Sequence, residues 1–254
     1  MSDAKPVAIQ LYTVREALAQ DWKGTLEKIA EKGYVGVETA GFGYAGSVEK
    51  AKAEFDRLGL QVVGAHSPLP LGENQSEIIE TAKAAGSSSL ICAGTGRDLF
   101  STEADIRDRA KVFNEANAVC KANGLAFGLH NHWWEYALVN GRIAYDILLE
   151  TLDDDIFFEI DTYWVASSGQ DPVAEINKLG KKVSLLHIKD GSTNQADDML
   201  AVGQGVMDFH KVIPAGQHAE WLVVELDRCG TNMMTAVNES YDYLIGQGLA
   251  RGNA

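Results

Sequence analysis

Short apolar runs alternate with longer helix-like segments along the whole 254-residue chain, and this alternation limits the fold more than any other feature. Eight runs have the length and apolar character of buried strands, at 7–13, 35–40, 61–68, 88–96, 126–132, 156–164, 183–191 and 221–227. Each precedes a segment with helical spacing, at 21–33, 47–59, 74–86, 102–124, 143–152, 171–180, 209–217 and 231–249. Ser47 and Gly59 suit the cap and the end of the second helix. Short buried strands separated by amphipathic helices pair in parallel.

Eight strand–helix pairs in a chain of this length predict the α/β class and a single (β/α)8 TIM barrel domain over residues 1–254. A doubly wound open sheet is the alternative. No Gly-x-Gly-x-x-Gly turn follows the first strand-like run, which disfavours a dinucleotide-binding fold. No linker or low-complexity segment marks a second domain.

The formal net charge of -14 argues against nucleic acid and an anionic membrane surface as partners. A nucleic-acid binder needs a basic face to displace counterions from phosphates, and an anionic membrane surface attracts basic proteins. No apolar run approaches ~20 residues, and the start of the chain lacks the apolar core of a signal peptide. The three cysteines are scattered. We therefore expect a cytoplasmic protein with a small-molecule partner, without nucleic acid or membrane; a homo-oligomer is compatible with these features.

Polar residues follow the last four strand-like runs at the point where each ends. His130 and His132 end the fifth, Asp161 the sixth, His187 the seventh and Glu225 the eighth. In a TIM barrel these carboxyl ends surround the active site. Imidazole and carboxylate groups together are typical ligands of a divalent cation such as Mn²⁺, Mg²⁺ or Zn²⁺.

Each of these residues also has a purely structural interpretation. His187 alone suits a hydrogen-bonded structural histidine, and Asp161 suits a turn cap. Glu225 is harder to explain in this way, because it interrupts the apolar run WLVVEL, and a carboxylate facing a barrel interior is costly unless it is paired. The occurrence of all of them on consecutive strands predicts a metal site.

The ordered motifs along the chain resemble those of the xylose isomerase-like TIM barrels, in particular the sugar phosphate isomerase/epimerase group. The motifs are IQLYTVRE, GYVGVETAGF, VVGAHSP, GLHNHWWEY, FEIDTYWVASSGQDP, LLHIKDG, VGQGVMDF and VVELD. The resemblance implies a metal held by a Glu, an Asp, a His and a second Glu, of which the last three correspond to Asp161, His187 and Glu225. At the first position this chain has His130 where such epimerases have a Glu before the Asn. The fourth ligand is therefore either His130 or Glu135.

The resemblance implies an isomerase or epimerase that acts on a keto sugar or related polyol through an enediolate, with one divalent ion (Mn²⁺, Mg²⁺, Zn²⁺ or Co²⁺). Glu225 is then the base on one face of the substrate, and His130 or His132 moves a proton on the other. The positions implied to contact the substrate are Glu38, His66, Trp134, Trp164, Lys189 and Gln204.

Three other functions remain open. A histidine in place of the first glutamate suits a metal-dependent lyase or dehydratase that acts on an inosose or a 3-keto-glycoside, because a histidine donates protons readily near neutral pH. An apurinic-site endonuclease belongs to the same superfamily but conflicts with the net charge. A sugar-binding barrel without catalysis is the third.

Overall fold

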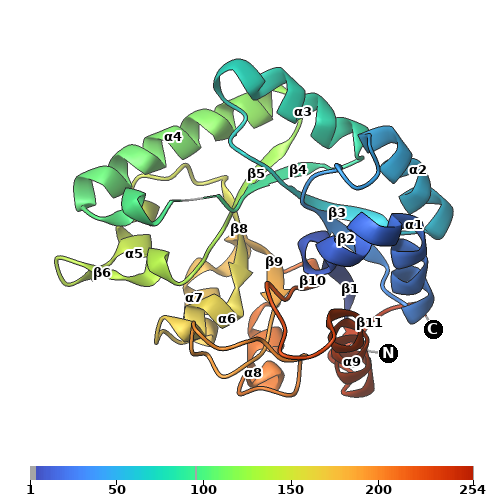
Figure 1. Ribbon diagram of the computed structural model, residues 1–254. Coiled ribbons are helices and arrows are strands. Elements are labelled where there is room, and N and C mark those ends of the chain that lie inside the picture. Colours follow the sequence, from blue (N-terminus) through green and yellow to red (C-terminus); the bar gives the residue numbers. More distant parts are fainter. Residues whose placement is uncertain (1–3, 95, 254) are drawn as a thin grey trace.

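The computed structural model describes residues 4–94 and 96–253, and in this part of the chain eight parallel strands form a closed barrel (Figure 1). The strands are β1 (Lys5–Gln10), β2 (Gly36–Thr39), β3 (Gln61–His66), β4 (Ser89–Cys92), β5 (Ala126–His130), β8 (Phe157–Asp161), β9 (Val183–Ile188) and β10 (Trp221–Val224). Each strand pairs with the next in this order, and β10 pairs with β1 to close the ring. The predicted single-domain TIM barrel is confirmed.

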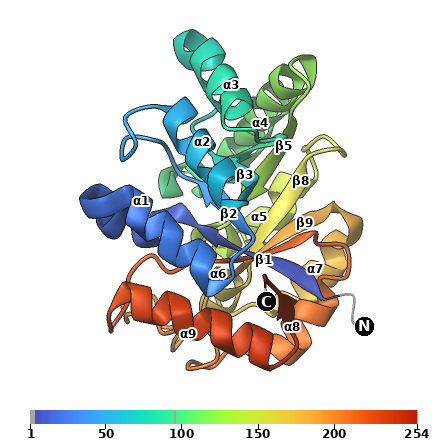
Figure 2. The ribbon, with the colours of Figure 1, turned by 90° about the vertical axis from the view of Figure 1, so that its right-hand side faces the viewer.

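Helices surround the barrel on its outside (Figures 1 and 2). They are α1 (Arg15–Lys32), α2 (Val48–Leu58), α3 (Gln75–Ala84), α4 (Glu103–Ala122), α5 (Ala144–Leu149), α6 (Thr162–Ser167), α7 (Pro172–Leu179), α8 (Phe209–Ala215) and α9 (Met233–Gly246). Short 3-10 turns lie at Leu11–Val14, Gly72–Asn74, Arg97–Phe100, Trp134–Tyr136 and Gly180–Lys182. As predicted, the Ser47 hydroxyl caps α2 by accepting from the Lys50 N–H at 3.3 Å, and Gly59 ends the helix in a left-handed conformation.

The sixth predicted strand, 156–164, was too long. It ends at Asp161, because the Asp161 carboxylate accepts from the Trp164 N–H at 2.9 Å and starts α6. Tyr163 and Trp164, which the predicted strand included, therefore lie on a helix. The hairpin of β6 (Leu138–Val139) and β7 (Arg142–Ile143) and the short β11 (Ala250–Arg251) were not predicted.

The described residues contain no helix with both the length and the hydrophobicity that crossing a membrane requires. Met1–Asp3, on which the expectation about a signal peptide partly rests, lie outside the described residues.

The interior of the barrel has an apolar layer below a polar one. Ala8, Ile91, Leu185 and Val223 form the apolar layer, with Phe157 packed against it. Gly128 makes room for this ring, because a Cβ there would lie 2.4 Å from Phe157. Since side chains alternate along a strand, the residues two positions further on face the same interior, nearer the carboxyl ends of the strands. After Ala8, Phe157, Leu185 and Val223 they are polar and belong to the candidate site, namely Gln10, Glu159, His187 and Glu225.

Candidate metal centre

Polar side chains from six of the eight barrel strands meet at the carboxyl end of the barrel, together with side chains that directly follow β9 and β10. The cluster consists of Gln10, Glu38, His66, His130, Glu159, Asp161, His187, Lys189 and Glu225, and all but the partly buried His66 are buried. The strand register sets the neighbours: His130 lies opposite Glu159, and Asp161 lies opposite His187.

Two overlapping groups in the described residues could hold a metal ion. One contains His130, Asp161, His187 and Glu225, and the other contains His66, His130, Glu159 and His187. Within each group the ligand atoms lie within 4.8 Å of one another. The first group, which we call the predicted metal group, unites the three residues expected from the strand ends with His130.

The two shared histidines direct different nitrogens to the two groups. His130 Nε2 lies 3.8 Å from Asp161 Oδ2, whereas its Nδ1 lies 3.1 Å from Glu159 Oε2. His187 Nδ1 lies 2.8 Å from Glu225 Oε2, whereas its Nε2 lies 3.1 Å from Glu159 Oε1. One ring nitrogen of each histidine therefore faces the predicted metal group and the other faces Glu159.

Lys189 lies inside the cluster, with a side chain that is 1% exposed. Its Nζ is 2.8 Å from Asp161 Oδ2, 2.6 Å from Glu225 Oε2 and 2.8 Å from Asp227 Oδ2. The same nitrogen lies 5.4 Å from the centre of the Trp164 ring. Lys189 is thus a cation held between two carboxylates of the predicted metal group.

The pKa values of His130 and His187 are shifted in opposite directions. Burial, followed by the neighbouring His187 charge, lowers the pKa of His130 well below its usual value, which favours the neutral imidazole that a metal binds. Burial also acts against the charged form of His187. The carboxylates of Glu159, Glu225 and Glu38 outweigh it and raise the pKa of His187 well above its usual value.

Glu225 and Glu38 also differ in protonation, because their pKa values are shifted in opposite directions. Burial alone would raise the pKa of Glu225, but Lys189 and His187 outweigh it and hold that pKa well below its usual value. Burial and the charge of Glu159 raise the pKa of Glu38 to about 7, against the opposing effects of His66 and His187. Glu225 is therefore ionised at neutral pH, and Glu38 titrates there.

Glu135, the other candidate for the fourth ligand, lies outside both groups. It is buried in the 3-10 turn after β5, where its Oε2 accepts from the His132 N–H at 2.9 Å and its Oε1 lies 3.5 Å from His132 Nδ1. His132 itself is partly exposed and stacks on Trp134, with ring centres 4.0 Å apart. The structure thus brings His132, Glu135 and Trp134 together beside the cluster.

Gln204 lies on the surface, away from the cluster, and donates from Nε2 to Glu239 Oε2 at 2.9 Å. The loop that carries Gln204 is held by Asp190, whose buried Oδ2 accepts hydrogen bonds from the N–H groups of Gly203 and Gly205 at 2.9 and 3.0 Å. These bonds hold the loop by the N–H groups on either side of Gln204, whose side chain is exposed. Of the six positions implied to contact substrate, Glu38, His66 and Lys189 lie in the cluster, and Trp134 and Trp164 lie beside it.

Sequence reasoning missed Glu159 and Gln10 as site residues. Glu159 is fully buried, and Gln10 donates from Nε2 to Glu38 Oε2 at 2.7 Å. The signal for Glu159 was present, because it precedes Asp161 by two residues on the same strand and so faces the same interior.

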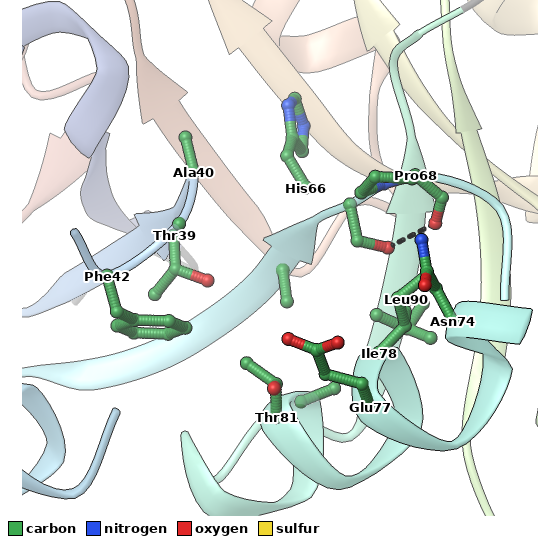
Figure 3. Close-up of a pocket in the computed structure, with 14 residues that line it drawn as sticks. Thr39, Ala40, Phe42, His66, Pro68, Asn74, Glu77, Ile78, Thr81 and Leu90 are labelled. Atoms are coloured by element: carbon green, nitrogen blue, oxygen red, sulfur yellow. Dashed lines mark hydrogen bonds between the residues drawn. The ribbon is translucent and has the colours of Figure 1, made fainter. Parts of the chain in front are cut away.

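A cavity of about 400 Å³ adjoins the cluster at His66 (Figure 3). Phe42 and Ile78 contribute apolar surface, and Glu77 and Thr81 of α3 extend into it at the end away from His66. It lies between the ends of β2 and β3 and the face of α3.

Comparisons with known proteins agree with this geometry. The family model of the xylose isomerase-like TIM barrels matches residues 26–244. A comparison with curated proteins finds no match. A sugar phosphate isomerase/epimerase from Parabacteroides distasonis ATCC 8503 is 26% identical, with 98% of this chain and 96% of that chain covered and a TM-score of 0.79. These matches confirm the resemblance that the motifs predicted.

Two further solved structures share the fold. An L-ribulose 3-epimerase is 18% identical over 96% of this chain and 94% of its own, with a TM-score of 0.73. The probable 3-DHS dehydratase of Bacillus anthracis involved in petrobactin synthesis is 15% identical over 94% of this chain and 98% of its own, with a TM-score of 0.71. At these identities the likeness is one of fold alone.

Proposed function

We propose that this chain, which belongs to the xylose isomerase-like TIM barrel family, is a divalent-metal-dependent isomerase or epimerase of a keto sugar or related polyol. The observation that carries the proposal is the predicted metal group: His130, Asp161, His187 and Glu225, buried together at the carboxyl end of the barrel. The 26% identical sugar phosphate isomerase/epimerase, matched over nearly the whole of both chains, supports the reaction class.

The residues present suit a divalent cation. Four carboxylates are buried in the cluster (Glu38, Glu159, Asp161 and Glu225), and one lysine ammonium lies among them. Glu38 Oε1 makes no hydrogen bond with the described residues. Buried carboxylates are costly without compensating positive charge, and a bound divalent cation can take over the compensation that protons on His187, His66 and Glu38 provide without it. Mixed imidazole and carboxylate ligands are compatible with Mn²⁺, Mg²⁺, Zn²⁺ or Co²⁺. When bound, such an ion supplies Lewis-acid polarisation of the carbonyl and hydroxyl oxygens of a keto sugar.

Proton transfer falls to Glu225 and His132. Glu225 is held in its ionised form by Lys189 and His187 and can accept the proton from the carbon beside the carbonyl, which leaves an enediolate. His130 has both nitrogens directed at carboxylates and is suited to hold the ion rather than to move a proton. His132 has a partly exposed ring and a backbone fixed by Glu135, so it suits proton transfer on the other face. Trp134, stacked on His132, offers an aromatic face to sugar C–H groups.

A lyase or dehydratase acting on an inosose or 3-keto-glycoside is the second candidate, and a specific observation favours it. The chain has His130 where a two-glutamate epimerisation would use its first carboxylate, and the ring of His132 lies 5.2 Å from that of His130. As an imidazolium, His132 can protonate a leaving group.

The test is proton exchange in D₂O. The metal-loaded protein is incubated with a panel of keto sugars, keto-cyclitols and 3-keto-glycosides, and the substrates are followed by NMR. We expect deuterium at the carbon beside the carbonyl without release of water or an aglycone, and a loss of at least about 100-fold in Asp161→Asn and Glu225→Gln. Lys178→Met, on the outer face of α7, is the control and should exchange at the wild-type rate.

Release of a leaving group would instead assign the protein to the lyases. Equal exchange rates in the wild type, Asp161→Asn and Glu225→Gln would refute the proposed site, as would failure of the wild type to exchange any member of the panel.

A further inference from the structure

We infer that Glu159 is a positioning residue, which fixes the ring orientation and the tautomer of both histidines in the predicted metal group from the side opposite the ion. The inference rests on the proposed metal site and assigns to Glu159 a role that is neither metal ligation nor substrate contact. It also means that the group around His66 holds protons rather than a second ion.

The geometry of the two histidines carries the inference. His130 and His187 each turn one nitrogen toward Asp161 or Glu225 and the other toward Glu159. Both contacts to Glu159 are 3.1 Å, one to each carboxylate oxygen. Glu159 therefore spans the two rings with one oxygen for each.

A ligand imidazole is neutral and carries a hydrogen on the nitrogen that does not bind the metal, and an outer carboxylate commonly accepts that hydrogen. For His130 the hydrogen is then on Nδ1, and for His187 it is on Nε2. An ionised carboxylate only accepts hydrogen bonds, so Glu159 Oε2 is suited to receive the one from His130. The Nε2 hydrogen of His187 lies between two carboxylates, with Glu38 Oε2 at 2.7 Å and Glu159 Oε1 at 3.1 Å.

Neighbouring side chains hold Glu159 itself in place. His66 Nε2 lies 2.6 Å from Glu159 Oε2 and contributes a third imidazole contact. Glu159 is fully buried, so solvent offers it no alternative partner. Glu38 reinforces the arrangement, because its Oε2 lies 2.7 Å from His187 Nε2 and accepts from Gln10 at 2.7 Å. The second group of four residues is thus a hydrogen-bonded support for the first.

Occupation of both groups by ions would require both shared histidines to bind metal through both nitrogens. Each imidazole would have to lose its remaining N–H proton, and Glu159 and Glu38 would lose the N–H groups that face them. We therefore expect one ion per chain.

The test compares Glu159→Gln with Glu54→Gln in the full chain. An amide retains the shape of Glu159 but replaces one acceptor oxygen with an NH₂ donor, which would face an imidazole N–H. Binding of Zn²⁺ and Mn²⁺, measured by competition with a chelator, should weaken about 10- to 100-fold in Glu159→Gln. Glu54 is also buried but pairs with Arg57 on α2, so Glu54→Gln should bind ions as the wild type does. Glu159→Asp keeps the acceptor and should lose less affinity than Glu159→Gln.

A measurement on the wild type needs no variant. In the Zn²⁺-loaded protein with ¹⁵N-labelled histidine, NMR should assign the N–H of His130 to Nδ1 and that of His187 to Nε2, and calorimetry should give one ion per chain. The opposite tautomers, two ions per chain, or an unchanged affinity in Glu159→Gln would each overturn the inference. A wild type that binds one ion with these tautomers but turns over no keto sugar would refute the proposed function alone. A wild type that binds no ion would overturn both.

Discussion

Replacement of Lys189 by Met tests whether its ammonium holds the charge balance of the cluster. Met retains an unbranched apolar stem of similar length and removes the ammonium group, with its charge and its three N–H donors. The substitution leaves Asp161 and Glu225, both buried, without their nearest cation, at 2.8 and 2.6 Å in the wild type. Asp227, the third partner, has a side chain that is 32% exposed, so water can replace the lysine there.

The magnitude follows from the burial of the two carboxylates. Removal of one partner from a buried ion pair destabilises a protein by about 3–5 kcal/mol, because the remaining charge has no partner. For a chain of this size each kcal/mol lowers the melting temperature by about 2–4 °C, so Lys189→Met should melt about 6–20 °C below the wild type without metal. Lys178 is the matched control: its Nζ also lies between two carboxylates, Asp146 at 2.6 Å and Glu175 at 2.5 Å, but its side chain is 39% exposed. Lys178→Met should cost at most about 1 kcal/mol.

Added metal should reverse part of the loss. Since Asp161 and Glu225 also belong to the predicted metal group, a divalent ion can neutralise them in place of the lysine. A ligand at 100 times its Kd stabilises a protein by about 2.7 kcal/mol, and the variant should gain more than the wild type because its carboxylates are freed from the lysine. The assay is thermal unfolding in EDTA and in saturating Mn²⁺. A variant within about 1 kcal/mol of the wild type in EDTA, or an equal gain from Mn²⁺ in both proteins, would refute the reasoning.

Two further substitutions test the electrostatics and the packing of the barrel interior. The pKa of Glu38 is raised from 4.5 to about 7, so folding takes up a proton and its contribution to stability, fully present below pH 4.5, is lost as the pH rises through 7. Glu38→Gln has no carboxyl group to titrate, so its free energy of unfolding relative to the wild type should be higher at pH 8 than at pH 5. Urea unfolding at the two pH values measures this, and a difference that does not change with pH contradicts the assignment. Gly128→Ala places a Cβ 2.4 Å from the Phe157 ring and should cost about 1–3 kcal/mol, part of which Phe157→Leu in the same chain should restore. Urea unfolding measures both, and a Gly128→Ala variant as stable as the wild type contradicts the packing argument.

The barrel could be predicted because strand and helix periodicity repeats eight times with glycines at helix ends, as at Gly59. Strand ends were less predictable, since they depend on individual side-chain contacts. The aromatic run after Asp161 continues the strand pattern, but the hydrogen bond from the Trp164 N–H to the Asp161 carboxylate converts it into a helix. Hydrophobic periodicity does not encode such a bond.

The strand-end residues Asp161, His187 and Glu225 were predictable for the same reason as the barrel, because the strand register brings them together. The choice between His130 and Glu135 was not, since it depends on side-chain direction. His130 is the last residue of β5 and faces the interior two positions after Gly128, whereas Glu135 turns back to the His132 N–H.

The hydrogen bonds of the cluster explain how the chain folds around so many carboxylates. Lys189 neutralises part of the charge of Asp161 and Glu225, and the raised pKa values of His187, His66 and Glu38 supply protons to the remainder. Without an ion, protons and one ammonium therefore occupy the electrostatic role that a divalent cation can take. Binding of an ion through His187 requires that histidine to give up a proton, while its other nitrogen keeps the contact to Glu159. Glu159, which is not a ligand itself, thus contacts His187 both when this histidine carries the extra proton and when it binds an ion.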